Sequence, residues 1–317
     1  MRRSQQRDDL HPHIISVMDE MGYDDPALAV RVKARSIIDD YHSFFGEEPP
    51  FSMSAMASFR DLHESEDAPR FSQDSEIAPT GDGRVVLRLN RNRPLTRQRF
   101  SIGHEIGHTL FPEYQLAVRC RKGRDRDWAD PNDLLETLCD VAASEFLFPA
   151  PWFRDRVLSM TLTADAVLTL SANYQASPEA TIRRLVELYP APLAAAFFSW
   201  KLKPTEMRQI RKIRRHKATA NSFPQSVPVP MLRVDYSILN DKFKNTCGSH
   251  IPKDKSIPED GVIHASSISQ IPQDGSGTLQ LGSVTGIFKI HALPIYTPDN
   301  RFSSSGGCSV VAILSPQ

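Results

Sequence analysis

The segment His104-Glu105-Ile106-Gly107-His108 decides how this sequence is interpreted. Apolar residues in and around it recur every four positions and predict a helix over about residues 96–111. Residues four apart lie on one helix face with Cβ atoms roughly 6 Å apart, so His104 and His108 can share one metal ion. Glu105 lies about 100° further round the helix, where it can reach a water bound to that metal. The segment therefore predicts a catalytic zinc (Zn²⁺) site with Glu105 as its general base.

A catalytic zinc ion is typically held by three protein side chains and a water, so two histidines are too few. The residues after His108 read Thr-Leu-Phe-Pro-Glu-Tyr, and this excludes the metzincin pattern HExxHxxGxxH, which needs a third histidine. Glu136 lies 28 residues further on, in a second predicted helix over about residues 131–148. We expect Glu136 to be the third metal ligand. Asp140, one turn later, is expected to accept a hydrogen bond from a ligand histidine.

Other interpretations of these two helices remain open. The first segment could be a buried amphipathic helix in which the two histidines are incidental. Glu136 and Asp140 could be ordinary solvated surface residues. Carboxylates among apolar residues are costly to bury unless they are paired or bind a cation, which favours the metal site. Asp133 lies near the start of the second helix, where the helix dipole favours a negative charge. Glu145 is the competing glutamate, more than two turns beyond Glu136.

The order of the predicted elements indicates an α+β fold in three parts. Residues 1–155 combine helices over 9–45, a strand over 84–90 and the two metal helices, and predict a zincin-like metallopeptidase domain with a small sheet. Residues 156–190 predict two short helices that resemble a helix-turn-helix. Residues 191–317 predict a β-rich C-terminal domain, for which a regulatory role is a hypothesis. Shorter elements are a helix over 51–62, a loop over 63–76, and strands at 195–203, 261–264, 279–290 and 309–314.

Composition narrows the class of protein. The 317 residues include 38 basic and 38 acidic ones, so net charge does not point to nucleic acid or an anionic membrane. The four cysteines form no CxxC pair and are too sparse for a disulfide scaffold. The N-terminus lacks the apolar core of a signal peptide, and the longest apolar run, residues 192–200, is far shorter than the ~20 residues of a membrane span. We therefore expect a cytoplasmic protein that is not embedded in a membrane.

The two metal helices also carry a family resemblance. His104–His108, followed by Glu136-x-Leu-Cys-Asp140-x-Ala-Ala143-x-Glu145-x-Leu147-x-Pro149, resembles the ImmA/IrrE metallopeptidases. The run Phe146–Pro149 is similar to the LLMP-like or LLLP-like ending of that family's second helix, and the resemblance covers roughly residues 30–190. It implies a gluzincin-type intracellular endopeptidase that cleaves helix-turn-helix repressors and so relieves repression of mobile-element or stress-response genes. Many relatives carry a second acidic residue and an Asn where this chain has Leu138 and Asp140.

A mechanism follows as a hypothesis. Zinc held by the three ligands would lower the pKa of a bound water towards ~7, and Glu105 would take the proton and return it to the leaving amine. The strand over 85–89 would offer its edge to an extended substrate. Tyr114 and His63 are candidates for stabilising the oxyanion, with an ordinary surface role as the alternative for each.

The basic segment from Lys201 to Lys217 contains eight Lys or Arg residues. Contact with DNA phosphates, aided by the helix pair, is one hypothesis. We favour a solvated linker between domains, because few aromatic residues interleave the charges. For the whole chain, the alternative to an enzyme is a DNA- or protein-binding regulator that keeps a metallopeptidase fold with little catalysis. Glu105 beside both histidines favours the enzyme, because a binding module needs no general base.

Overall fold

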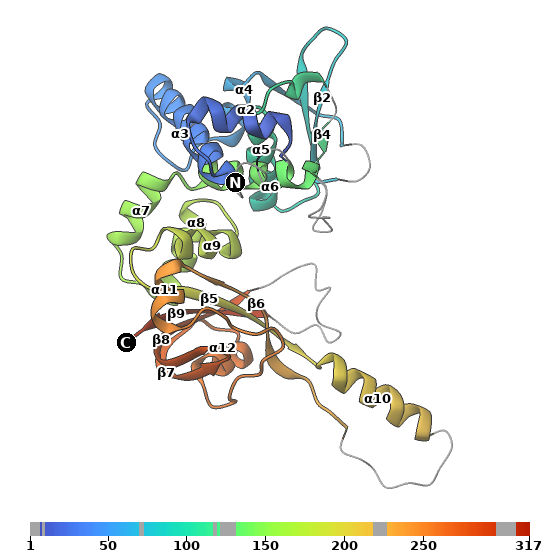
Figure 1. The fold of residues 1–317 in the computed structure, drawn as a ribbon, viewed down its shortest axis with the longest axis vertical. Coiled ribbons are helices and arrows are strands. Elements are labelled where there is room, and N and C mark those ends of the chain that lie inside the picture. Colours follow the sequence, from blue (N-terminus) through green and yellow to red (C-terminus); the bar gives the residue numbers. More distant parts are fainter. Residues whose placement is uncertain are drawn as a thin grey trace. The chain divides into compact units, whose positions relative to one another are not determined.

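The computed structural model describes residue 7 and residues 10–69, 73–116, 119–120, 131–217, 227–295 and 309–317, with only the backbone described at 119–120, 131–132 and 214–217. The chain divides into two compact units, residues 1–156 with 170–180 and residues 157–169 with 181–317. The two units therefore interleave in sequence within the helix pair (Figure 1). The boundaries expected from the sequence, at 155/156 and 190/191, stay a prediction.

The first unit begins with the helices α2 (Pro12–Met21), α3 (Pro26–Phe45) and α4 (Met53–Phe59). A proline at the first position of α2 and α3 suits a site whose N–H has no partner within the helix. Asp25 caps α3 by accepting hydrogen bonds from the backbone N–H groups of Ala27 and Leu28 at 2.8 and 3.1 Å. Gly22 ends α2 in the left-handed conformation, with φ of 73°. The helices predicted over 9–45 and 51–62 are confirmed.

A four-stranded sheet follows, in the order β1-β3-β2-β4. Its strands are β1 (Leu62–Ser65), β2 (Ser75–Pro79), β3 (Val85–Leu89) and β4 (Arg119–Cys120). Strand β3 runs parallel to β1 and antiparallel to β2, and β2 is also antiparallel to β4. The predicted strand at 84–90 is thereby confirmed.

Two predictions about this sheet were wrong. The segment 63–76 is not one loop, because β1 and β2 occupy its two ends. These strands are short and contain polar residues, so the local sequence does not mark them as strands. Strand β3 cannot offer its edge to a substrate, because β1 and β2 bond to its two sides. The edges of this sheet, within the described residues, are β1 and β4.

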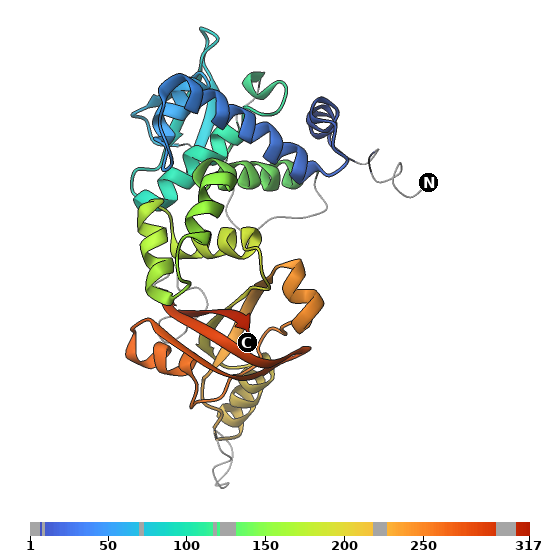
Figure 2. The same cartoon turned by 90° about the vertical axis from the view of Figure 1, so that its left-hand side faces the viewer.

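The helices predicted over about residues 96–111 and 131–148 are confirmed as α5 (Leu95–His108) and α6 (Pro131–Leu147). Helix α5 packs against β2 and β3 on one side and against α6 on the other, and α3 covers α6 (Figure 2). The short helix η2 (Tyr114–Leu116) follows α5, and α7 (Ala150–Leu158) follows α6. The sheet and α6 thus hold α5 between them.

The predicted pair of short helices is confirmed as α8 (Ala164–Asn173) and α9 (Pro178–Leu188). The Ser177 hydroxyl accepts a hydrogen bond from Ala180 N–H at 3.2 Å, as expected for a residue that caps α9. Helix α9 buries Ile182 and Leu185 on its apolar face.

The second unit contains a five-stranded antiparallel sheet in the order β6-β5-β9-β8-β7. Its strands are β5 (Ala194–Lys201), β6 (Met231–Leu239), β7 (Gln273–Leu281), β8 (Val284–Ile295) and β9 (Ser309–Pro316). Alternate residues of the central strands, such as Ala196 and Phe198, enter a core that also contains Phe243 and Ile263. These two belong to the helices α11 (Asp241–Cys247) and α12 (Val262–Ser269). The predicted α+β class and the β-rich C-terminal part are confirmed.

Two C-terminal predictions need correction. The run 261–264 was predicted as a strand, but it begins helix α12, because Ile263 packs into the core from a helix that lies against the sheet. The basic segment from Lys201 was interpreted as a linker between domains, but it forms helix α10 (Pro204–Lys217), which connects β5 and β6 of one sheet. No helix in the described parts of the chain is both long and apolar enough to cross a membrane.

Candidate metal centre

Helices α5 and α6 approach closely because glycines of α5 face small residues of α6. A Cβ atom at Gly107 would lie 3.0 Å from the Cα of Cys139, and one at Gly103 would lie 3.3 Å from the Cα of Ala143. Real Cβ atoms rarely come so near a neighbouring backbone, so larger residues here would push the helices apart. The Gly103 and Gly107 pattern thus brings the carboxylates of α6 within reach of the histidines of α5.

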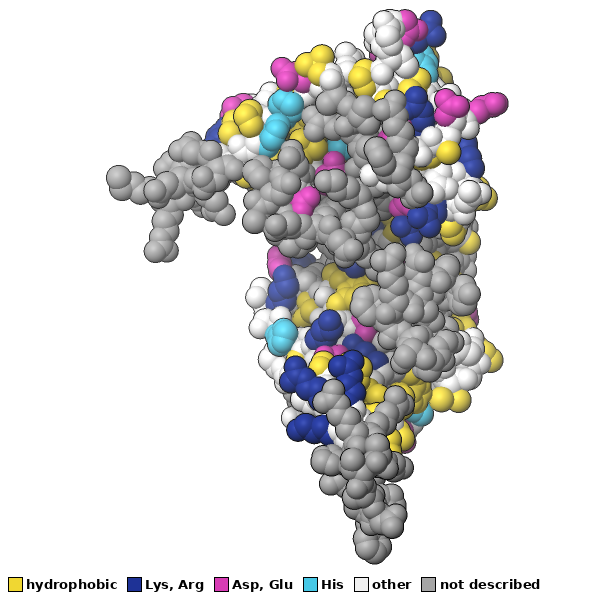
Figure 3. Space-filling view, turned by 90° about the vertical axis from the view of Figure 1, so that its right-hand side faces the viewer, with side chains coloured by type: hydrophobic (Ala, Val, Ile, Leu, Met, Phe, Trp, Pro, Cys, Tyr) yellow, Lys and Arg dark blue, Asp and Glu magenta, His cyan; other side chains and the backbone are white. Residues whose placement is uncertain are grey.

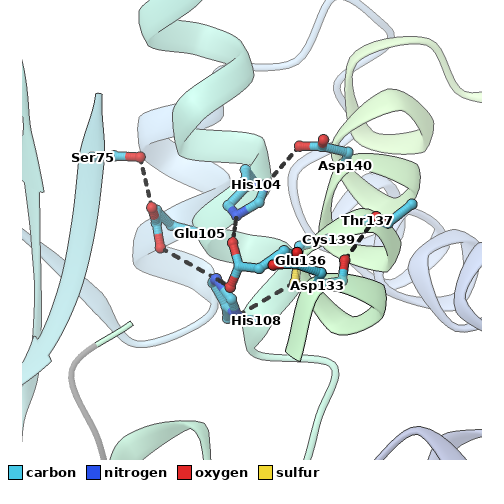
Figure 4. Close-up of polar contacts among 9 residues, drawn as sticks. All are labelled: Ser75, His104, Glu105, His108, Asp133, Glu136, Thr137, Cys139 and Asp140. Atoms are coloured by element: carbon cyan, nitrogen blue, oxygen red, sulfur yellow. Dashed lines mark hydrogen bonds and ion pairs between the residues drawn. The ribbon is translucent and has the colours of Figure 1, made fainter. Parts of the chain in front are cut away.

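His104 is fully buried and contacts an acidic side chain through each ring nitrogen. Its Nδ1 lies 2.8 Å from Asp140 Oδ1, and its Nε2 lies 3.2 Å from Glu136 Oε2 (Figure 4). Burial by itself would lower the pKa of His104, but the hydrogen bonds to Asp140 and Glu136 outweigh it and raise the pKa to about 9. Asp140 therefore contacts His104, one of the two histidines for which it was predicted as a partner.

His108 is also buried and is oriented from both sides. Its Nε2 lies 3.5 Å from Glu136 Oε1 and 3.9 Å from Glu105 Oε2. Its Nδ1 lies 3.3 Å from the Sγ atom of Cys139. The Nε2 atoms of both histidines therefore face the same carboxylate, that of Glu136.

Glu105 is fully buried, and a hydroxyl from the sheet fixes its orientation. Ser75 of β2 donates a hydrogen bond to Glu105 Oε1 at 2.6 Å. The preceding residue, Asp74, forms ion pairs with Arg93 at 2.7 Å and with Arg97 of α5 at 2.8 Å. These pairs hold the start of β2 against α5 and keep Ser75 beside the glutamate. Ser75 was not among the residues predicted from the sequence, because it lies in the segment expected to be a loop.

Glu145, the competing glutamate, has a different role. Its fully buried carboxylate contacts Arg35 Nε at 2.8 Å and Arg31 at 3.6 Å, both from α3. It also accepts a hydrogen bond from the backbone N–H of Ala150 at 3.0 Å. Glu145 therefore joins α6 to α3 and to the start of α7.

The remaining sequence candidates contribute nothing visible to this cluster. His63 is an exposed residue of β1, and the Tyr114 hydroxyl accepts a hydrogen bond from Gln115 at 3.1 Å. Asp133 lies in the first turn of α6, where a carboxylate suits the helix dipole.

The arrangement could bind a metal ion. Ligand atoms of His104, His108 and Cys139, all buried, lie within 4.8 Å of one another. The carboxylate of Glu136 adds oxygens beside the Nε2 atoms. Imidazole, thiolate and carboxylate are the groups that zinc binds in proteins. The chemistry of the donors therefore fits such an ion.

Comparison with known proteins shows what this region is similar to. Residues 59–186 match the Peptidase_M78 family, whose description is the IrrE N-terminal-like domain. This part of the chain is therefore similar to the IrrE N-terminal-like domain. It holds both histidines, Glu105 and the whole of α6. Over 171 residues the chain is 26% identical to the radiation response metalloprotease IrrE of Deinococcus radiodurans. That match covers 54% of this chain and 49% of the relative, so the chain spans about half the length of that protein.

A solved structure is similar in fold over the whole chain, including the residues outside 59–186. A Mycobacterium tuberculosis transcriptional regulator aligns with a TM-score of 0.51, over 100% of this chain and 82% of that one. The sequence identity is 12%, so the likeness concerns the fold alone. The predicted kinship with IrrE-type metallopeptidases is confirmed by the family match and the Deinococcus relative.

Proposed function

We propose that this protein is a zinc-dependent endopeptidase, with His104, His108 and Glu136 as metal ligands. The spacing of these ligand atoms carries the proposal. Atoms bound to one tetrahedral zinc ion at about 2.1 Å are about 3.4 Å apart. The Glu136 oxygens lie 3.2 Å from His104 Nε2 and 3.5 Å from His108 Nε2. The separation of Glu136 from each histidine is thus close to the one that a shared ion requires.

Cys139 competes with Glu136 for the place of third ligand. Its sulfur lies next to Nδ1 of His108, whereas Glu136 lies next to Nε2 of both histidines. A set that uses Nε2 twice needs no rotation of either ring, which favours Glu136. Nδ1 of His108 then points away from the ion and towards Cys139. Cys139 holds the ring in place, as partners of ligand histidines do.

A bound zinc ion supplies Lewis acidity, which polarises a carbonyl and lowers the pKa of water. The protein's own contribution is Glu105, whose Oε2 points to the metal side of His108 while Ser75 holds Oε1. From this position Glu105 accepts a proton from the attacking water and later delivers it to the leaving amine. Because Glu105 is buried and fixed by its neighbours, the base is oriented before a substrate arrives.

The substrate class rests on the relatives. The Deinococcus relative is named a radiation response metalloprotease, and the resemblance of the metal helices implies cleavage of a helix-turn-helix transcriptional repressor. We therefore propose a folded protein regulator as the substrate, cut at an accessible peptide bond.

The decisive experiment compares the native chain with Glu105→Gln. We expect the variant to bind zinc in the native amount and to lose cleavage of a candidate repressor, because an amide cannot accept the proton. Zinc content by mass spectrometry and cleavage by gel analysis measure the two properties. Glu145→Gln is the matched control, since it removes an equally buried carboxylate outside the site. Undiminished cleavage by Glu105→Gln would refute the mechanism, and zinc bound without cleavage by the native chain would favour a regulator with little catalysis.

A further inference from the structure

Helix α10 concentrates positive charge in a chain that is neutral as a whole. Its sequence, PTEMRQIRKIRRHK, holds four Arg and two Lys but a single acid, Glu206. Figure 1 shows α10 extending away from the five-stranded sheet of the same unit, and Figure 3 shows Lys and Arg side chains gathered at the lower part of one face. The charge is thus presented on a projecting element.

The basic residues follow one helix face. Arg208, Arg211 and Lys212 are related by steps of three and four and are all exposed. The sequence continues this spacing to Arg215. Ile210 and Ile213 lie on the other side of the helix and are half-buried. We call Arg208, Arg211 and Lys212 the α10 basic stripe.

Nothing in the described residues neutralises this stripe. Glu206, the one acid of α10, accepts a hydrogen bond from Lys203 N–H and forms a 2.8 Å ion pair with the buried Arg233 of β6. It therefore anchors the start of the helix to the sheet. No ion pair involves Arg208, Arg211 or Lys212 within the described part of the chain.

The helix pair α8 and α9 offers no comparable surface. The only basic residues of α9 are Arg183 and Arg184. Arg183 lies over the ring of Tyr236, 5.1 Å from its centroid. Arg184 is buried and pairs with Glu187 at 3.0 Å. Both arginines of the helix-turn-helix-like pair thus have partners inside their own unit, whereas Arg208, Arg211 and Lys212 of α10 are exposed.

We propose that the α10 basic stripe binds the phosphate backbone of duplex DNA without reading its sequence. The stripe and its continuation to residue 215 span about 10 Å at 1.5 Å per residue, a length over which a duplex carries about six phosphate charges. Arginine forms paired hydrogen bonds to phosphate, which suits this composition. An anionic membrane fits less well, because α10 lacks aromatic or leucine side chains and its isoleucines are half-buried.

The test measures binding of the full chain to a short mixed-sequence DNA duplex by fluorescence anisotropy, at salt between about 50 and 200 mM. Replacing the stripe by Arg208→Gln, Arg211→Gln and Lys212→Gln should weaken binding more than about tenfold and flatten the salt dependence by about three units of slope. The matched control is Lys253→Gln, Lys255→Gln and Lys289→Gln, which removes three exposed charges elsewhere in the same unit. The control should bind as the native chain does.

Two further variants guard against a folding defect. Lys212→Gln alone should reduce the slope of DNA affinity against salt by about one unit. The double variant Arg208→Lys, Arg211→Lys should keep most of the slope, because the charge remains. Glu105→Gln should bind DNA like the native chain, which separates this proposal from the proposed protease. The proposal is overturned by absence of DNA binding in the native chain, by an equal loss in the control triple, or by stripe-dependent binding to phosphatidylserine vesicles alone.

Discussion

Helix α6 carries carboxylates on two sides, and the two sides differ in their partners. Glu145 faces the guanidinium groups of Arg31 and Arg35, whereas Glu136 and Asp140 face the ring nitrogens of histidine. A guanidinium always carries its own charge, so Glu145 is compensated within the protein. An imidazole ligates a metal in its neutral form, so the Glu136 side is suited to share a cation with it. One helix thus joins a structural pair to a candidate metal centre.

The largest expected effect comes from Glu136→Gln, which removes the ligand charge. We expect zinc affinity to fall by more than the ~100-fold that loss of an outer partner causes, and cleavage to fall with it. Added zinc should raise the melting temperature of the native chain but not of this variant, because only a bound ligand stabilises the fold. Calorimetric titration with zinc and thermal unfolding measure both. Native zinc affinity in Glu136→Gln would assign the third ligand to Cys139 instead.

Asp140→Ala should produce the next largest effect. Asp140 holds Nδ1 of His104 at 2.8 Å, and loss of such a partner lowers zinc affinity about 10- to 100-fold. Asp140→Asn should recover part of the loss, because its amide oxygen can still accept the hydrogen bond. Zinc competition with a chelator of known affinity measures the difference. If Asp140→Ala binds zinc like the native chain, the two carboxylates of this side do not act together.

Glu145→Gln should show the reverse pattern. The variant leaves two arginines without their carboxylate and should lower the free energy of unfolding by about 1–2 kcal/mol, a reduced value because Arg35 is partly exposed. Zinc content should not change, since Glu145 does not contact the histidines. Urea unfolding of the zinc-loaded protein provides the measurement. A loss of zinc here would break the distinction between the two sides of α6.

Ser75→Ala is expected to have the smallest effect. The hydroxyl orients Glu105 without touching the ligands, so cleavage should slow by about tenfold at most while zinc affinity remains unchanged. Ser75→Thr keeps the hydroxyl and should restore most of the rate. Kinetics under saturating substrate would show the change in kcat rather than in KM. An equal loss in the threonine variant would point to packing instead of hydrogen bonding.

Much of the metal centre could be predicted from local sequence. The four-residue spacing of His104 and His108 places them on one helix face whatever surrounds the helix, because helical periodicity is a local property. The same reasoning placed Glu136 and Asp140 on one face of α6. Each of these inferences required only one helix at a time.

Tertiary structure alone decided the partners of these residues. Ser75 reaches Glu105 because β2, part of a segment that looks like a loop, packs against α5, and this contact joins residues 30 positions apart. Only the packing of α3 shows that Glu145 pairs with arginine, and only the approach of α6 to Gly107 places Cys139 beside His108. The sequence by itself determined the helices and the residue types of the centre. The fold decided which side chains meet, because those contacts join segments that no local pattern connects.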